Sequence, residues 1–143
     1  MKGVIALIAS LGYSLAWGEA CDVRTEQASE QVPVVQTHIC YEYAHMPEGS
    51  INWSCSREDQ GVSPSTKQRV AHCPADARAS CTATLTAESL SNERSASRDP
   101  GQDPPTIPEG AQIITWYYQI EQQAQARNDC ENNGGIFQLK TTQ

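Results

Sequence analysis

This sequence has few large apolar side chains, and the scarcity limits the kind of fold that it can form. Phe occurs once in 143 residues, and from residue 21 onward only 17 of 123 residues are Leu, Ile, Val or Phe. A share below about 20% is typical of chains whose apolar surface cannot offset the entropy of folding. The chain therefore needs another source of stability.

Motifs for catalysis and cofactor binding are also missing. The sequence has no nucleophile elbow, no H-E-x-x-H segment, no phosphate-binding loop and no dinucleotide fingerprint. Three histidines lie near cysteines, but without the paired spacing of structural zinc sites: His38, His45 and His72. An even number of cysteines leaves no free thiol for a Cys–His nucleophile. We therefore expect no catalytic residue, no metal ligand and no cofactor.

Basic residues are outnumbered by acidic ones. Lys and Arg total 10 against 17 Asp and Glu, which gives a net charge of −7. An acidic surface repels the phosphates of nucleic acids and of anionic lipids. We expect no nucleic-acid partner and, after removal of the amino-terminal segment, no membrane insertion.

The amino-terminal segment 1–20 has the pattern of a signal peptide. Lys2 precedes an uncharged, mostly apolar run, and small residues stand at the −3 and −1 positions of a cleavage site after Ala20. Cys21 would then begin the mature chain, which raises the alternative of a lipoprotein. Gly18 stands where such proteins carry Leu, and acylation would leave five cysteines. We therefore expect a soluble, exported, periplasmic or extracellular protein with a single domain at residues 21–143.

Six cysteines supply the stabilisation that the small core lacks. An exported chain meets an oxidising compartment, and each of three disulfides contributes on the order of 3 kcal/mol. The sequence alone leaves 15 pairings open. The favoured pairing joins neighbours: Cys21–Cys40, Cys55–Cys73 and Cys81–Cys130. The main alternative joins Cys73 to Cys81 and Cys55 to Cys130.

Residue patterns predict an α+β fold, a small, mainly antiparallel sheet with one or two short helices. β-branched, aromatic and alternating segments predict strands near 38–43, 81–86, 112–118 and 136–139. A segment rich in Gln, Ala and Glu predicts the main helix near 119–132, ended by Gly134-Gly135.

Two further segments are predicted to be irregular. Residues 21–36 are polar and are expected to form an exposed lead-in, with one edge strand near 34–36. Residues 91–110 hold four prolines and one aliphatic residue, Ile107, and are expected to form a flexible loop.

The first predicted strand and the strand near 112–118 show a similar order of residues. At an offset of 75 positions, four residues match: Ile39 with Ile114, Tyr41 with Trp116, Tyr43 with Tyr118, and Cys55 with Cys130. The match indicates either two related strand–helix units or a coincidence between two aromatic strands.

Aromatic residues gather on these same two strands and are the candidate binding residues. Trp116 and Tyr118 share one face of an extended strand, while Tyr117 points to the other. Exposed aromatic patches mark partner sites, although in a chain poor in aliphatic residues the rings could instead form the core. The candidate partner-binding residues are Tyr41, Tyr43, Trp116 and Tyr118.

The order of short motifs resembles small, cysteine-rich exported proteins of Gram-negative bacteria that are uncharacterised. The resemblance covers residues 40–137 and rests on Cys40-Tyr41-Glu42-Tyr43, Cys55, Cys73-Pro74, Cys81, Trp116-Tyr117-Tyr118, and Cys130 with Gly134-Gly135. The chain departs from the pattern in its segment 91–110 and in Ala79-Ser80, where a glycine turn is expected. The resemblance implies export and a disulfide-braced fold, and no activity.

The sequence favours a non-catalytic binding module. Its expected partner is an envelope protein or peptide, and its role could include inhibiting or neutralising that partner. The alternative is a small exported hydrolase or toxin-type enzyme, which would need a positioned base or nucleophile in a cleft.

Overall fold

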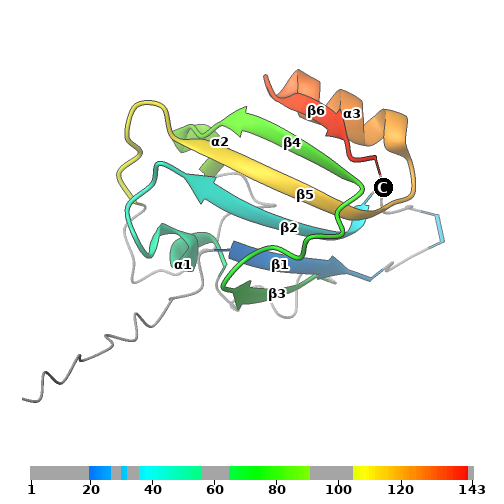
Figure 1. The fold of residues 1–143 in the computed structure, drawn as a ribbon, viewed down its shortest axis with the longest axis horizontal. Helices are drawn as coiled ribbons and strands as arrows, with labels where there is room; N and C mark the ends of the chain where they lie inside the picture. Colours follow the sequence, from blue (N-terminus) through cyan, green and yellow to red (C-terminus); the bar gives the residue numbers. More distant parts are fainter. Residues whose placement is uncertain (1–19, 27–29, 32–35, 56–64, 91–104, 142–143) are drawn as a thin grey trace, which may run out of the picture.

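A six-stranded antiparallel sheet forms the centre of the protein (Figure 1). The computed structural model describes residues 20–26, 30–31, 36–55, 65–90 and 105–141. The strands lie in the order β3-β1-β2-β5-β4-β6, and each pairs with its neighbours in antiparallel fashion. Their bounds are β1 Ala20–Thr25, β2 Gln36–Ala44, β3 Ser65–Val70, β4 Ala79–Thr84, β5 Gln112–Ile120 and β6 Ile136–Leu139.

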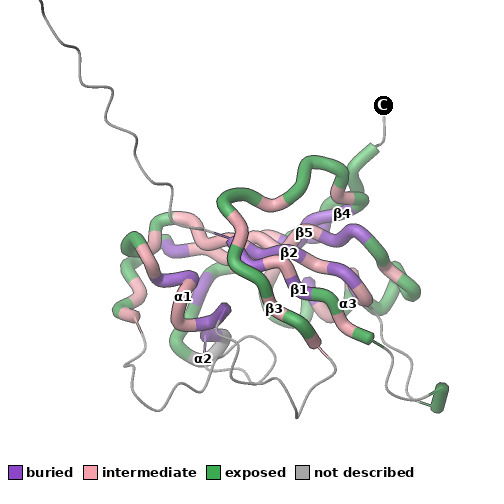
Figure 2. Tube along the Cα trace, turned by 90° about the horizontal axis from the view of Figure 1, so that it is seen from below, coloured by how far each residue is buried: buried purple, intermediate pink, exposed green. Residues whose placement is uncertain are grey.

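Helices are short and few, and they lie on one side of the sheet (Figure 2). They are α1 Ser50–Ser54, α2 Ala87–Leu90 and α3 Gln123–Asn132. The prediction of a mainly antiparallel sheet with short helices and disulfides is confirmed, although the fold is largely β with little helix. The strands predicted near 38–43, 112–118 and 136–139 correspond to β2, β5 and β6, whereas β4 begins and ends two residues earlier than the prediction of 81–86.

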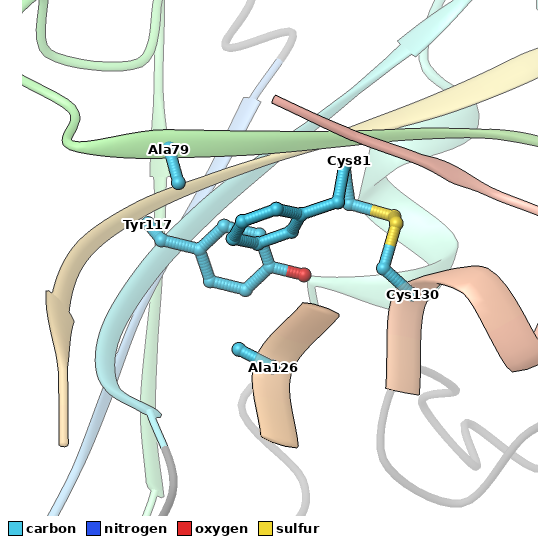
Figure 3. Close-up of a cluster of buried hydrophobic side chains, with 6 residues drawn as sticks. Ala79, Cys81, Tyr117, Ala126 and Cys130 are labelled. Atoms are coloured by element: carbon cyan, nitrogen blue, oxygen red, sulfur yellow. A yellow bond between two sulfur atoms is a disulfide. The ribbon is translucent and has the colours of Figure 1, made fainter. Parts of the chain in front are cut away.

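Side-chain alternation gives the sheet two different faces. The helix face is covered by α1 and α3, and it holds two buried clusters. The larger cluster joins β4, β5, β6 and α3 (Figure 3): Ala79, Cys81, Tyr117, Ala126, Cys130 and Phe137. The opposite side, which we call the loop face, is covered by the segment 71–78 that joins β3 to β4 (Figure 2). Ala20, Cys40 and Tyr118 are buried beneath this segment.

The disulfides confirm one predicted pairing and contradict two. Cys81 pairs with Cys130 as expected, but Cys21 pairs with Cys55 and Cys40 with Cys73. The reason is strand register, which places Cys21 opposite Tyr41 on the helix face and so puts Cys40 on the loop face. Cys21 and Cys40 therefore point to opposite sides of the sheet and cannot bond to each other.

The prediction of an exposed lead-in at residues 21–36 is wrong for its first part. Residues 20–25 form β1, which lies inside the sheet between β3 and β2, and Cys21 is fully buried. Cysteine is among the most buried residue types, so Cys21 and Val23 supply the apolar alternation of this otherwise polar strand. The predicted edge strand near 34–36 falls mostly outside the described residues, as does most of the predicted loop at 91–110.

The order of residues shared by β2 and β5 does not reflect equivalent positions in the sheet. Tyr41 lies on the helix face, whereas its match Trp116 pairs with Cys40 and so lies on the loop face. Strand β2 is followed by α1 and β5 by α3, and both helices pack on the helix face. Two strand–helix units are thus present, but the matched residues on the two strands are shifted by one position and lie on opposite faces of the sheet.

Helix α3 begins at Gln123, later than the predicted 119, because β5 continues to Ile120, and it ends at the two glycines that the sequence indicates. Gly134 has a positive φ of 74°, and its N–H donates to the Glu131 carbonyl at 3.0 Å. The Gly135 N–H donates to the Cys130 carbonyl at 2.9 Å. This pair of bonds is a Schellman motif, which satisfies carbonyls at the end of the helix. It also turns the chain into β6 directly over the Cys81–Cys130 disulfide.

Two buried phenols should make stability fall at alkaline pH. Burial, and secondarily the Asp129 carboxylate, raises the pKa of Tyr117 to about 12. Burial, and secondarily Tyr43, raises the pKa of Tyr41 as well. Below pH 10 the phenols are neutral in both the folded and the unfolded chain, so they do not make the free energy of unfolding depend on pH. Above about pH 10 only the unfolded chain releases these protons, and stability is lost as the pH rises through the folded pKa.

We expect the free energy of unfolding to fall between about pH 10 and 12, with Tyr117 contributing a slope of up to about 1.4 kcal/mol per pH unit. Urea unfolding at a series of pH values measures this slope. A Tyr117→Phe variant should lose its share of the pH dependence. A slope that is the same in both proteins would contradict the assignment.

Candidate functional site

A cleft of about 440 Å³ opens on the loop face of the sheet. Its walls come from three parts of the chain that are distant in sequence: β2 and β5 at the sheet, the segment between β3 and β4, and the residues that follow β6. The lining residues are Glu42, residues 72–77, Trp116, and Lys140 with Thr141.

The segment 71–78 is tied to the sheet at several points, so it forms a fixed wall. The Cys40–Cys73 disulfide anchors its first half to β2. The Tyr118 hydroxyl donates a hydrogen bond to the Pro74 carbonyl at 2.6 Å. The Arg78 N–H donates to the Tyr117 carbonyl at 2.7 Å, which returns the chain to β5. A covalent link and two hydrogen bonds therefore fix this segment to the sheet.

Trp116 is the largest side chain in the lining of the cleft. It is half-buried, and its indole N–H donates to Oε1 of Glu42 on the adjacent strand β2 at 3.1 Å. The Nζ atom of Lys140 lies 4.8 Å from the centroid of the Trp116 ring. An ammonium group at this distance over an indole face makes a cation–π interaction. The site thus presents an oriented aromatic surface that already contacts one cation.

Carboxylates make the surroundings of the cleft negative. Glu42 and Asp76 line it directly. Burial first, and then the charges of Asp76, Asp22 and Glu42, raise the pKa of Tyr118 to about 12. Glu42 and Asp76 therefore favour cations over anions at the cleft. Asp22 is already paired with Arg24, whose Nε lies 3.3 Å from Asp22 Oδ2.

A His–Asp pair lies next to the cleft and is part of the packed structure. His38 Nε2 and Asp22 Oδ1 are 2.6 Å apart, and both side chains are mostly buried. The His38 ring stacks on Tyr118 with centroids 4.5 Å apart. Pairing with Asp22 and stacking on Tyr118 leave the His38 side chain only 11% exposed.

The three histidines that the sequence singled out are not brought together. His38 stacks on Tyr118, His45 lies in a bend after β2 with a φ of 61°, and His72 lines the cleft. Among the described residues, no group of three or more His, Cys, Asp or Glu side chains is arranged to hold a metal ion.

The structure separates the four aromatic candidates. Trp116 lines the cleft, and Tyr118 supports the wall of the cleft from beneath. Tyr41 is buried on the helix face, where its hydroxyl donates to Ser54 Oγ at 3.0 Å. Tyr43 is half-buried on the same face, with its ring centroid 5.8 Å from that of Tyr41. Only Trp116 is thus placed to contact a partner in the cleft.

Sequence reasoning missed the charged residues of the site. Glu42 follows Cys40 by two positions and therefore shares its face of β2, which the alternation of a strand could have shown. Asp76 and Lys140 reach the cleft only through the path of the chain between β3 and β4 and after β6. No local pattern in the sequence indicates that path.

Comparison with family models, curated proteins and solved structures finds no match to this chain. The resemblance to exported cysteine-rich proteins therefore stays an expectation. Three disulfides indicate an oxidising, exported environment. Among the described residues, no helix is long and apolar enough to cross a bilayer.

Proposed function

We propose that this protein is an exported, non-catalytic binding module whose partner docks at the Trp116 cleft. The observation that carries the proposal is the cleft itself, which is lined by an indole ring and two carboxylates, held on paired strands and on a segment tied to the sheet by a disulfide. Indole rings at the centre of a pocket often carry much of the energy of an interface.

The partner that fits this surface is a basic protein or peptide of the cell envelope. Glu42 and Asp76 supply negative charge at the cleft. Complementary charge mainly sets specificity and the rate of association. Docking of a basic segment could inhibit or neutralise the partner.

Features consistent with export also support a binding role in the cell envelope. Residues 1–20 are proposed to act as a signal peptide. The Cys21–Cys55 disulfide uses the sulfur that a lipid anchor would need, which favours an unacylated chain. Ala20 is buried at the start of β1, and cleavage after it would leave Cys21–Thr25 in the sheet.

A hydrolase or toxin-type enzyme is the weaker alternative. A histidine base needs access to substrate, but the His38 side chain is only 11% exposed, paired with Asp22 and stacked on Tyr118. His72 and the Thr141 hydroxyl both line the cleft, and the described lining contains no serine or free thiol. Thr141 could act as a nucleophile only with a base within hydrogen-bond reach, whereas binding needs only the recognition groups that the cleft already presents.

The proposal can be tested by binding the oxidised mature protein to an array of peptides with graded net charge. We expect preferential binding to basic peptides, and loss of that binding in a Trp116→Ala variant. Ile136→Ala is the matched control, because Ile136 is a large exposed apolar residue on β6 outside the cleft. Charge-independent binding, or equal loss in both folded variants, would count against the proposal.

A further inference from the structure

We propose that the Trp116 cleft binds a primary ammonium group, the side chain of a lysine in the partner, and that Lys140 of the protein itself occupies this position until the partner displaces it. The inference rests on the proposed function and specifies the chemistry of the group that enters the cleft. Its basis is the position of the Lys140 ammonium at 4.8 Å from the centroid of the Trp116 ring.

The hydrogen bond from the Trp116 indole to Glu42 favours binding of a cation on the face of the ring. A carboxylate that accepts the indole N–H increases the electron density of the ring, and this strengthens its attraction for a cation on its face. The bond also fixes the ring orientation, since Trp116 and Glu42 come from adjacent paired strands. Asp76 and Glu42 line the same cleft, and their negative charges would attract a bound ammonium group.

Lys140 can leave the ring without disturbing the fold. Its backbone N–H donates to the Arg78 carbonyl at 2.8 Å, so the main chain is held at the end of β6. Its side chain is exposed and flexible, and only this side chain has to move. A cation–π contact at an exposed site is weak, equivalent to roughly a 2- to 5-fold change in binding constant. A lysine held by further contacts of a partner can therefore compete with it.

The test measures binding of Nα-acetyl-lysine methylamide to the oxidised mature protein, through the NMR signal of the Trp116 indole N–H. That signal is assigned by its disappearance in a Trp116→Phe variant. We expect a saturable shift with the lysine probe and none with the same probe acetylated on Nε, because acetylation removes the charge. Equal shifts with both probes, or no shift with the lysine probe, would overturn the inference.

The second part of the test removes the Lys140 ammonium group, which competes with the probe for the Trp116 ring. Lys140→Gln should bind the probe about 2- to 5-fold more tightly than the wild-type protein. Arg127→Gln is the control for net charge, because Arg127 lies on α3 over Phe137, on the helix face. Affinity in Lys140→Gln that is no higher than in Arg127→Gln would contradict displacement. If basic peptides bind through Trp116 while this probe fails, the ammonium inference alone is wrong.

Discussion

Replacing both Cys81 and Cys130 with alanine should lower the free energy of unfolding by about 4 kcal/mol. The disulfide joins residues 49 positions apart, so its loss releases a long loop in the unfolded chain. Its sulfur atoms also pack in the cluster that contains Tyr117 and Phe137. Total stabilities of small domains are about 5–15 kcal/mol, and a thin core makes this loss a large share of the total.

Urea unfolding of the oxidised variant, followed by circular dichroism, measures the effect. Peptide mapping without reduction is the control, and it should find Cys21 linked to Cys55 and Cys40 linked to Cys73 in both proteins. A change below about 1 kcal/mol, or a different pairing in the wild-type protein, would contradict the role given to this disulfide.

A Gly135→Ala substitution should destabilise the protein by about 1–3 kcal/mol, the usual cost of overpacking a filled core. A Cβ at residue 135 would lie 2.7 Å from the Sγ atoms of both Cys81 and Cys130, and 2.9 Å from the Cys130 carbonyl oxygen. The disulfide and the end of α3 cannot move away easily, because the Cys81–Cys130 bond attaches both to β4. The turn into β6 would have to shift instead.

The same substitution in the Cys81→Ala, Cys130→Ala background separates this clash from a general effect of alanine. Without the two sulfur atoms, most of the close contacts disappear, so the cost of Gly135→Ala should fall. Urea unfolding of the four proteins gives the coupling energy. Equal costs in the two backgrounds would mean that the disulfide is not what requires glycine at this position.

The elements of this fold that the sequence predicts are those with strong local patterns. β2 and β5 carry β-branched and aromatic runs, and α3 carries a helix-favouring run with a glycine stop. β1 was missed because its apolar alternation depends on a cysteine and one valine in a polar segment. The other two disulfide pairs were predicted wrongly for the same reason, since without β1 the opposite orientations of Cys21 and Cys40 could not be deduced, whereas Cys81–Cys130 was predicted correctly.

The candidate site was predictable only in part. Alternation placed Trp116 and Tyr118 on one face, and the structure puts both at the cleft, one in its lining and one beneath its wall. The assignment of Tyr41 to a partner surface does not hold, because strand pairing turns this residue into the core. Lys140 reaches Trp116 only because β6 pairs with β4 beside β5, a contact between distant parts of the chain.

Hydrogen–deuterium exchange tests most directly whether the Trp116 cleft is the binding surface. The oxidised mature protein is compared with and without the tightest-binding basic peptide from the array, at a saturating concentration. The account predicts slower exchange in residues 71–78 and 138–141, with α1 and α3 on the opposite side of the sheet unchanged. Protection confined to the helices or to the edge strand β3, with none in residues 71–78, would contradict it.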